Sequence, residues 1–124
     1  MNFNSYQVKA DHRNTSKLAE KSQWTVTEFG ELQMFVEAMQ NQWNCSKGFL
    51  WSLLSEGGTL QQVGYDKANA LYLSKFRSDH QHQWHGYPIH PRHDDIPPKT
   101  VTNDWRNKSL ISNVTANRIT QGKL

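Results

Sequence analysis

An apolar stripe with helical spacing gives the strongest indication of how this chain folds. Phe29, Leu32, Val36, Met39 and Trp43 recur three or four residues apart, which places them on one side of an α-helix. The stripe covers fewer than three heptads and lacks flanking charge pairs, so a helix packed on a core is favoured over a coiled coil. It therefore predicts an amphipathic helix over residues 26–44 whose apolar side faces the core.

The start of this helix carries a capping signal. Thr25 and Glu28 have the spacing of a capping box, and Glu28 and Glu31 suit the positive end of a helix dipole. The preceding residues 1–22 are polar and show no sustained periodicity. They are expected to form a flexible or loosely docked N-terminal arm, followed by a single α+β domain over residues 23–124.

The next segments have strand and turn signals. An apolar run at 49–54 and a second run at 59–65 flank Gly57 and Gly58, which predicts a β-hairpin. Residues 70–77 are predicted as a third strand of a small antiparallel meander. The alternative for 66–77 is a helix capped by Asp66, because Ala, Leu and Lys favour helices.

A histidine- and proline-rich segment follows at 78–98. It holds all four prolines and five of the six histidines. Because proline fixes φ and lacks an N–H, the segment is predicted to be a long irregular loop. Loops of this length in a compact domain are usually functional or disordered.

The end of the chain predicts two short helices. Pro97 and Pro98 suit a first helical turn, with Val101 and Trp105 on one face. Ser112 then caps a second helix, which Gly122 ends. The fold class is thus α+β, with an N-terminal amphipathic helix, a small antiparallel β-meander, a long His/Pro-rich loop and a C-terminal helix pair.

Composition and charge limit the partners. Apolar residues make up only 35% of the 124 residues, and no run approaches the length of a membrane span. A single cysteine and the absence of a signal-peptide pattern favour a cytoplasmic location and no membrane partner. The net charge of +3 divides unevenly, since 24–66 carry one lysine against five carboxylates and 67–124 carry nine basic and four acidic side chains. A basic C-terminal half favours nucleic acid or an acidic protein surface as the partner.

The histidine cluster allows two kinds of chemistry. The candidate metal ligands are His80, His82, His85 and Asp94, since imidazole and carboxylate suit zinc or another divalent ion. Their spacing matches no defined zinc motif, and the main prediction is that no cofactor is bound. The alternative is metal-free acid–base catalysis by His85 and His90 with Arg92 as the cation.

Nucleic-acid binding has two candidate surfaces. Aromatic rings beside cations bind single strands, which singles out Trp84 and Tyr87 with Arg77. Polar and basic side chains of the C-terminal helix pair could contact bases and phosphates. These side chains are Arg106, Lys108, Asn113, Asn117 and Arg118.

Three functions remain open at this point. The first is a non-enzymatic interaction module that binds nucleic acid or an acidic protein through its basic half. The second is a small, nuclease-like hydrolase that uses residues 80–95, with or without a metal ion. The third is an inhibitor or immunity-type protein that binds another protein through the acidic helix at 26–44. The sequence predicts no oligomeric state.

Overall fold

The computed structural model of this chain describes residues 5–124, and residues 1–4 of the predicted arm lie outside the described part. Within the described part the α-helices are α1 (Glu28–Gln40), α2 (Lys99–Asn107) and α3 (Asn113–Thr120). Short 3-10 helices are η1 (Ala10–Arg13), η2 (Thr15–Lys17) and η3 (His93–Asp95). The strands are β1 (Ser5–Tyr6), β2 (Gln23–Trp24), β3 (Leu50–Leu53), β4 (Ser55–Glu56), β5 (Thr59–Leu60), β6 (Gly64–Tyr65), β7 (Ala70–Leu71), β8 (Leu73–Ser78) and β9 (Gln83–Ile89). This content confirms the α+β class.

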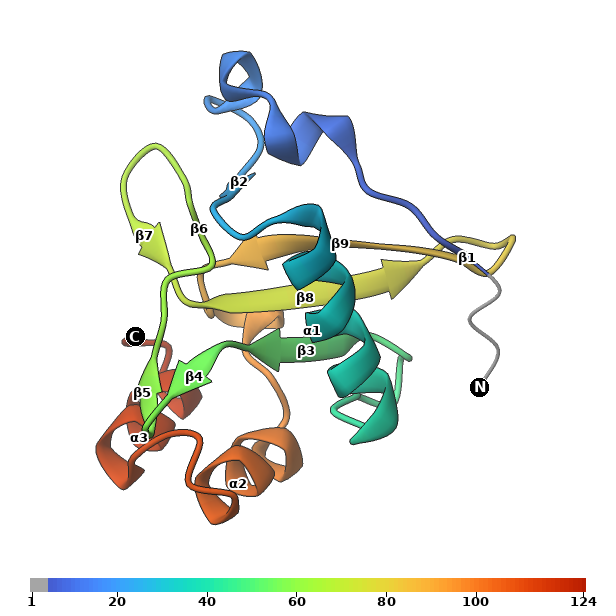
Figure 1. Ribbon diagram of the computed structural model, residues 1–124. Helices are drawn as coiled ribbons and strands as arrows, with labels where there is room; N and C mark the ends of the chain where they lie inside the picture. Colours follow the sequence, from blue (N-terminus) through green and yellow to red (C-terminus); the bar gives the residue numbers. More distant parts are fainter. Residues whose placement is uncertain (1–4) are drawn as a thin grey trace.

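The main sheet has the strand order β1-β9-β8-β3. Strand β8 pairs antiparallel with both β3 and β9, and β1 adds a short parallel pair to β9. Helix α1 crosses one face of this sheet, and α2 and α3 lie together at the C-terminal end of the chain (Figure 1). None of these helices is long and apolar enough to cross a bilayer within residues 5–124.

Part of the core lies between α1 and the sheet, and the same buried cluster extends to Trp105 of α2 and Ile119 of α3. Phe35 of α1 packs on Phe76 of β8 and Trp84 of β9, with ring centroids 5.6 and 5.4 Å apart. All three side chains are buried, together with Leu50 of β3. Burial of such large aromatic groups supplies the main stabilisation in a chain with few apolar residues.

The predicted helix is present, but its buried side differs from the predicted one. The buried residues of α1 are Glu31, Met34, Phe35 and Ala38, a stripe with the same helical spacing as the predicted one. In contrast, the Phe29 side chain is 68% exposed and Leu32 is 40% exposed. The prediction that the 29–43 stripe faces the core is therefore wrong for the first half of the helix.

The cap of α1 also lies two residues later than predicted. Thr27 is the N-cap, and its hydroxyl accepts a hydrogen bond from the Gly30 N–H at 3.0 Å. Thr25 instead donates its backbone N–H to the Val63 carbonyl at 2.8 Å and lies outside the helix. The pairing of 23–25 with the β6 region thus delays the helix.

The predicted hairpin around Gly57 and Gly58 forms only near its turn. There β4 pairs with β5 and the Gln61 N–H donates to the Leu54 carbonyl at 2.8 Å, while β3 pairs with β8. All four β3 side chains are buried, so β3 needs a partner strand whose side chains can also be buried. The first four residues of β8 are buried as well, whereas 59–65 includes the polar pair Gln61 and Gln62.

Residues 70–77 adopt the predicted strand conformation, as β7 and most of β8. The long loop predicted at 78–98 is wrong over 83–89, which form β9. Proline is tolerated in this strand because β1 pairs only with Gln83 and Trp84, leaving the outer edge near Pro88 without a paired strand. The C-terminal helices are confirmed, with Ser112 as the N-cap of α3 and Gly122 in a left-handed conformation at φ 68°.

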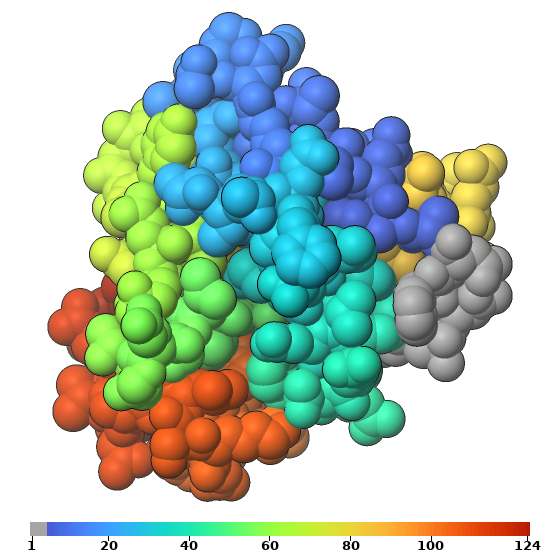
Figure 2. All heavy atoms as spheres, viewed as in Figure 1, coloured from blue at the N-terminus to red at the C-terminus, as the bar shows by residue number. Residues whose placement is uncertain are grey.

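The N-terminal arm is anchored over its described residues 5–22. The Arg13 guanidinium donates to the Glu31 carboxylate of α1 at 2.8 Å, and the Tyr6 hydroxyl donates to the same carboxylate. Figure 2 shows the arm and α1 in contact on one side of the molecule. These contacts bring η1 to the edge of β9.

Candidate functional site

The candidate site is built on the sheet face opposite α1. In the β8–β9 register, Lys75 lies opposite Tyr87 and Arg77 lies opposite His85. Side chains alternate along a strand, so these four point away from the face that carries Phe76 and Trp84. The face therefore combines cations, an imidazole and a phenol on adjacent strands.

Two cations of this face have different roles. The Lys75 ammonium is buried and lies 3.0 Å from the Asp95 carboxylate, and it also sits 4.5 Å from the Phe49 ring centroid. Its charge is thus already neutralised. The Arg77 side chain is exposed, contacts the Phe49 ring at 5.7 Å, and has no carboxylate within ion-pair distance among residues 5–124. Arg77 is therefore free to bind an anion.

His12 joins this face from η1. Its ring stacks on the Tyr87 ring, with centroids 5.5 Å apart and an interplanar angle of 18°. Its Nδ1 lies 2.7 Å from the Ser22 carbonyl oxygen. A carbonyl can only accept, so Nδ1 carries the hydrogen, and Nε2 is the basic nitrogen of the neutral ring.

His85 lies on the other side of this group. Its ring centroid is 6.4 Å from that of Tyr87. Burial lowers the pKa of His85, and the nearby cations Lys9 and Arg77 and the His12 ring lower it further. Burial also lowers the pKa of His12, against the opposing effect of the Ser22 carbonyl. Both imidazoles are therefore mainly neutral at pH 7.

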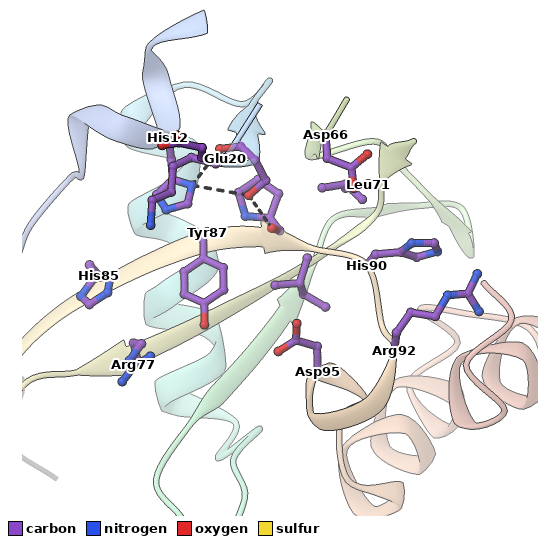
Figure 3. A pocket seen from close by; sticks show the side chains of 14 residues that line it. His12, Glu20, Asp66, Leu71, Arg77, His85, Tyr87, His90, Arg92 and Asp95 are labelled. Atoms are coloured by element: carbon purple, nitrogen blue, oxygen red, sulfur yellow. Dashed lines mark hydrogen bonds between the residues drawn. The ribbon is translucent and has the colours of Figure 1, made fainter. Parts of the chain in front are cut away.

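These side chains line an open groove of about 550 Å³. Figure 3 shows His12, His85 and Arg77 grouped beside the Tyr87 ring at one end, with His90 and Arg92 at the opposite end. Lys21 also lines the groove. Of the lining carboxylates, Asp95 is paired with Lys75, and Asp66 accepts backbone N–H groups of its own turn. Glu20 is the third.

The structure brings together some of the residues that the sequence singled out. The groove is lined by two of the three residues predicted to bind single strands, Arg77 and Tyr87, and by all three predicted catalytic residues, His85, His90 and Arg92. The three candidate catalytic residues do not form one cluster, because His90 and Arg92 lie at the far end from His85 (Figure 3). The His90 ring is held by the backbone oxygen of Leu124 at 3.0 Å.

Other candidates for nucleic-acid binding lie elsewhere. The Trp84 side chain is only 4% exposed and belongs to the core, so the prediction that it forms a stacking platform is wrong. The remaining candidates belong to α2, α3 and the segment between them, and none lines the groove. They are Arg106, Lys108, Asn113, Asn117 and Arg118. Two of them already have partners, since Lys108 binds Asp104 at 2.6 Å and Arg118 binds the Lys123 carbonyl at 2.8 Å.

The candidate metal ligands come from three separate places. His80 and His82 lie in the turn between β8 and β9, His85 lies in β9, and Asp94 lies in η3. In residues 5–124, no three side chains from His, Cys, Asp and Glu are placed to hold a metal ion.

Sequence reasoning missed His12 and Lys21. Both lie in the segment predicted as a flexible or loosely docked arm, and no local pattern connects residue 12 with residue 87. The only signal was a histidine among basic residues in that arm.

Comparison with known proteins gives no further guide to this site. No model of a protein family, no curated protein and no solved structure matches the chain.

Proposed function

We propose that this protein binds a single-stranded segment of nucleic acid in the groove formed by η1, β8 and β9. The observation that carries the proposal is the exposed and unpaired Arg77 guanidinium beside the stacked rings of His12 and Tyr87. Single strands are bound by a combination of cations for phosphates and ring faces for bases. The groove offers both within one surface.

The arginine nearest the stacked rings favours a phosphodiester. Arg77, Arg92 and Lys21 supply three positive charges along the groove, against the carboxylates of Glu20 and Asp66, and Asp95 is already paired with Lys75. Arginine suits phosphate because its planar fork can donate two parallel hydrogen bonds. A bound phosphate at Arg77 would leave the adjacent base within reach of the His12–Tyr87 stack.

We expect the groove to bind a single strand in preference to a duplex. The bases of a duplex are stacked and paired, so a ring at the base of a groove can reach only an unpaired base. The helix pair that the sequence suggested for duplex contacts lies outside this groove.

The test is fluorescence anisotropy with a labelled single-stranded DNA oligonucleotide over a series of salt concentrations. Binding should weaken with salt, and Arg77→Ala should reduce the slope of log K against log salt by about 0.7, the amount expected for one lost phosphate contact. Tyr87→Ala should weaken the free energy of binding by about 1–3 kcal/mol, the usual contribution of one stacked base. Tyr87→Phe keeps the ring and should retain most of this contribution.

Two controls make this test specific. Arg106→Ala removes the same charge from α2 and should leave binding unchanged, whereas the helix-pair prediction expects a loss. Polyglutamate of similar length tests the acidic-protein alternative. Equal affinity for polyglutamate and the oligonucleotide, or a Tyr87→Ala variant that binds normally, would contradict the proposal.

A further inference from the structure

The geometry points to a reaction at the Arg77 end of the groove, namely cleavage of RNA by acid–base catalysis, with His12 as the base and His85 as the acid. This inference rests on the proposed binding of a single strand and goes beyond it. It needs two imidazoles on either side of a phosphate, together with a cation that holds the phosphate oxygens. His12, His85 and Arg77 line the same groove from η1, β9 and β8, and the Tyr87 ring centroid lies 5.5 Å from that of His12 and 6.4 Å from that of His85.

The orientation of His12 suits a general base. The Ser22 carbonyl oxygen lies 2.7 Å from Nδ1 and fixes the hydrogen on that nitrogen. Nε2 of the neutral ring therefore carries no proton. Stacking on Tyr87 holds the plane of the ring. The position of η1 is fixed in turn by the Arg13–Glu31 ion pair and by the Gln23 amide, which donates to the Asp11 carbonyl at 2.8 Å.

The surroundings of His85 suit a proton donor to a leaving oxygen. Its ring nitrogens make no hydrogen bond within residues 5–124, so they are available to substrate. Arg77 lies directly opposite on β8. A phosphate bound by Arg77 would thus contact His85 at the same time, and its negative charge would stabilise the protonated imidazole.

The chemical step needs no reactant other than the RNA itself. His12 Nε2 takes the proton of the ribose 2′-hydroxyl as the 2′-oxygen attacks phosphorus. The bond from phosphorus to the 5′-oxygen breaks, and His85 gives its proton to that oxygen. The products are a 2′,3′-cyclic phosphate and a free 5′-hydroxyl, and Arg77 stabilises the charge that develops on the phosphate oxygens.

The pH dependence follows from the groups around each ring. Burial lowers the pKa of both rings. Lys9, Arg77 and His12 lower that of His85 further, against Asp79, and the Ser22 carbonyl and Asp11 oppose the lowering at His12, to which Lys21 adds. One ring must be protonated and the other neutral, and both pKa values lie below the usual value of about 6.5. The kcat/KM profile should therefore be bell-shaped, with its maximum on the acidic side of pH 6.5.

The experiment incubates a labelled RNA oligonucleotide with the full chain in EDTA and identifies the products by mass. Cleavage with a 2′,3′-cyclic phosphate end is expected, and a 2′-deoxy substitution at the cut position should abolish it. His12→Asn keeps a donor for the Ser22 carbonyl but removes the base, and His85→Gln removes the acid. Each should lower kcat/KM about 100- to 10,000-fold. His85 is not part of the ring stack, so His85→Gln should still bind the DNA oligonucleotide within a few-fold of the original.

His93→Asn is the matched control. His93 is exposed in η3 and does not line the groove, and asparagine tolerates its left-handed backbone at φ 53°. This variant should cleave normally. DNA binding without RNA cleavage, cleavage that stops in EDTA, cleavage at the 2′-deoxy position, or full activity of both histidine variants would overturn the inference and leave the proposed binding intact. Failure to bind the DNA oligonucleotide would instead remove the proposed function itself.

Discussion

At the scale of single residues, Gly86 allows the strand that carries the candidate site to pack against the core. A Cβ atom at this position would overlap the Phe76 ring and come 3.0 Å from the Tyr6 hydroxyl oxygen. Because Phe76 is fully buried under α1, it has little room to move. The bare backbone at Gly86 therefore lets β9 lie close to the core while His85 and Tyr87 point to the open face.

We expect Gly86→Ala to lower the free energy of unfolding by about 1–3 kcal/mol, the usual cost of overpacking a core. Gly30→Ala is the control, because its Cβ would have 3.4 Å to the nearest atoms of Val26 and Thr27 and alanine favours a helix. Urea denaturation of both variants checks this. Equal stability of the two variants would contradict the role of Gly86.

At the scale of elements, α1 shows why a sequence pattern can predict a helix and miss its buried side. The stripe that faces the core includes a carboxylate and is therefore less apolar than the 29–43 stripe. It consists of Glu31, Met34, Phe35 and Ala38. The exposed Phe29 and Leu32 lie beside Glu28 and Glu37. Whether this acidic and apolar surface binds another protein, as the third hypothesis held, stays a prediction.

The two phenylalanines of α1 allow a matched test of this orientation. Phe35→Ala should cost about 3–5 kcal/mol, because it removes a fully buried ring that contacts Phe76 and Trp84. Phe29→Ala makes the same chemical change at a side chain that is 68% exposed and should stay within about 0.5 kcal/mol. Thermal and chemical denaturation measure both. A large loss for Phe29→Ala would instead support the sequence-predicted stripe.

At the scale of the whole molecule, one buried carboxylate joins the arm to the body. Glu31 is fully buried, and burial raises its pKa against the lowering effects of Tyr6 and Arg13. Arg13 supplies the compensating charge from η1, next to His12. Stability and the candidate site are thus coupled through the same ion pair.

Removing one partner of this pair should be costly. Arg13→Met should lower the free energy of unfolding by about 3–5 kcal/mol, because it leaves an uncompensated buried carboxylate. Adding Glu31→Gln should recover part of this loss, and the double-mutant cycle measures the coupling. Arg13→Met should also weaken binding of the DNA oligonucleotide, because His12 loses its anchor. Normal stability and binding in the single variant would show that the arm is not held by Glu31.

Local sequence patterns are enough to predict the α+β class, the existence of α1, the two C-terminal helices with their caps, and several residues of the candidate site. These features depend on neighbours in the chain, since helical spacing, capping side chains and the composition of 75–92 are local. Contacts between distant segments instead set the partner of β3, the strand conformation of 83–89, the buried side of α1 and the position of His12 beside Tyr87. Each of these depends on groups distant in sequence, such as Arg13 for Glu31 or β8 for β3, and the free energy that selects them is burial shared between segments.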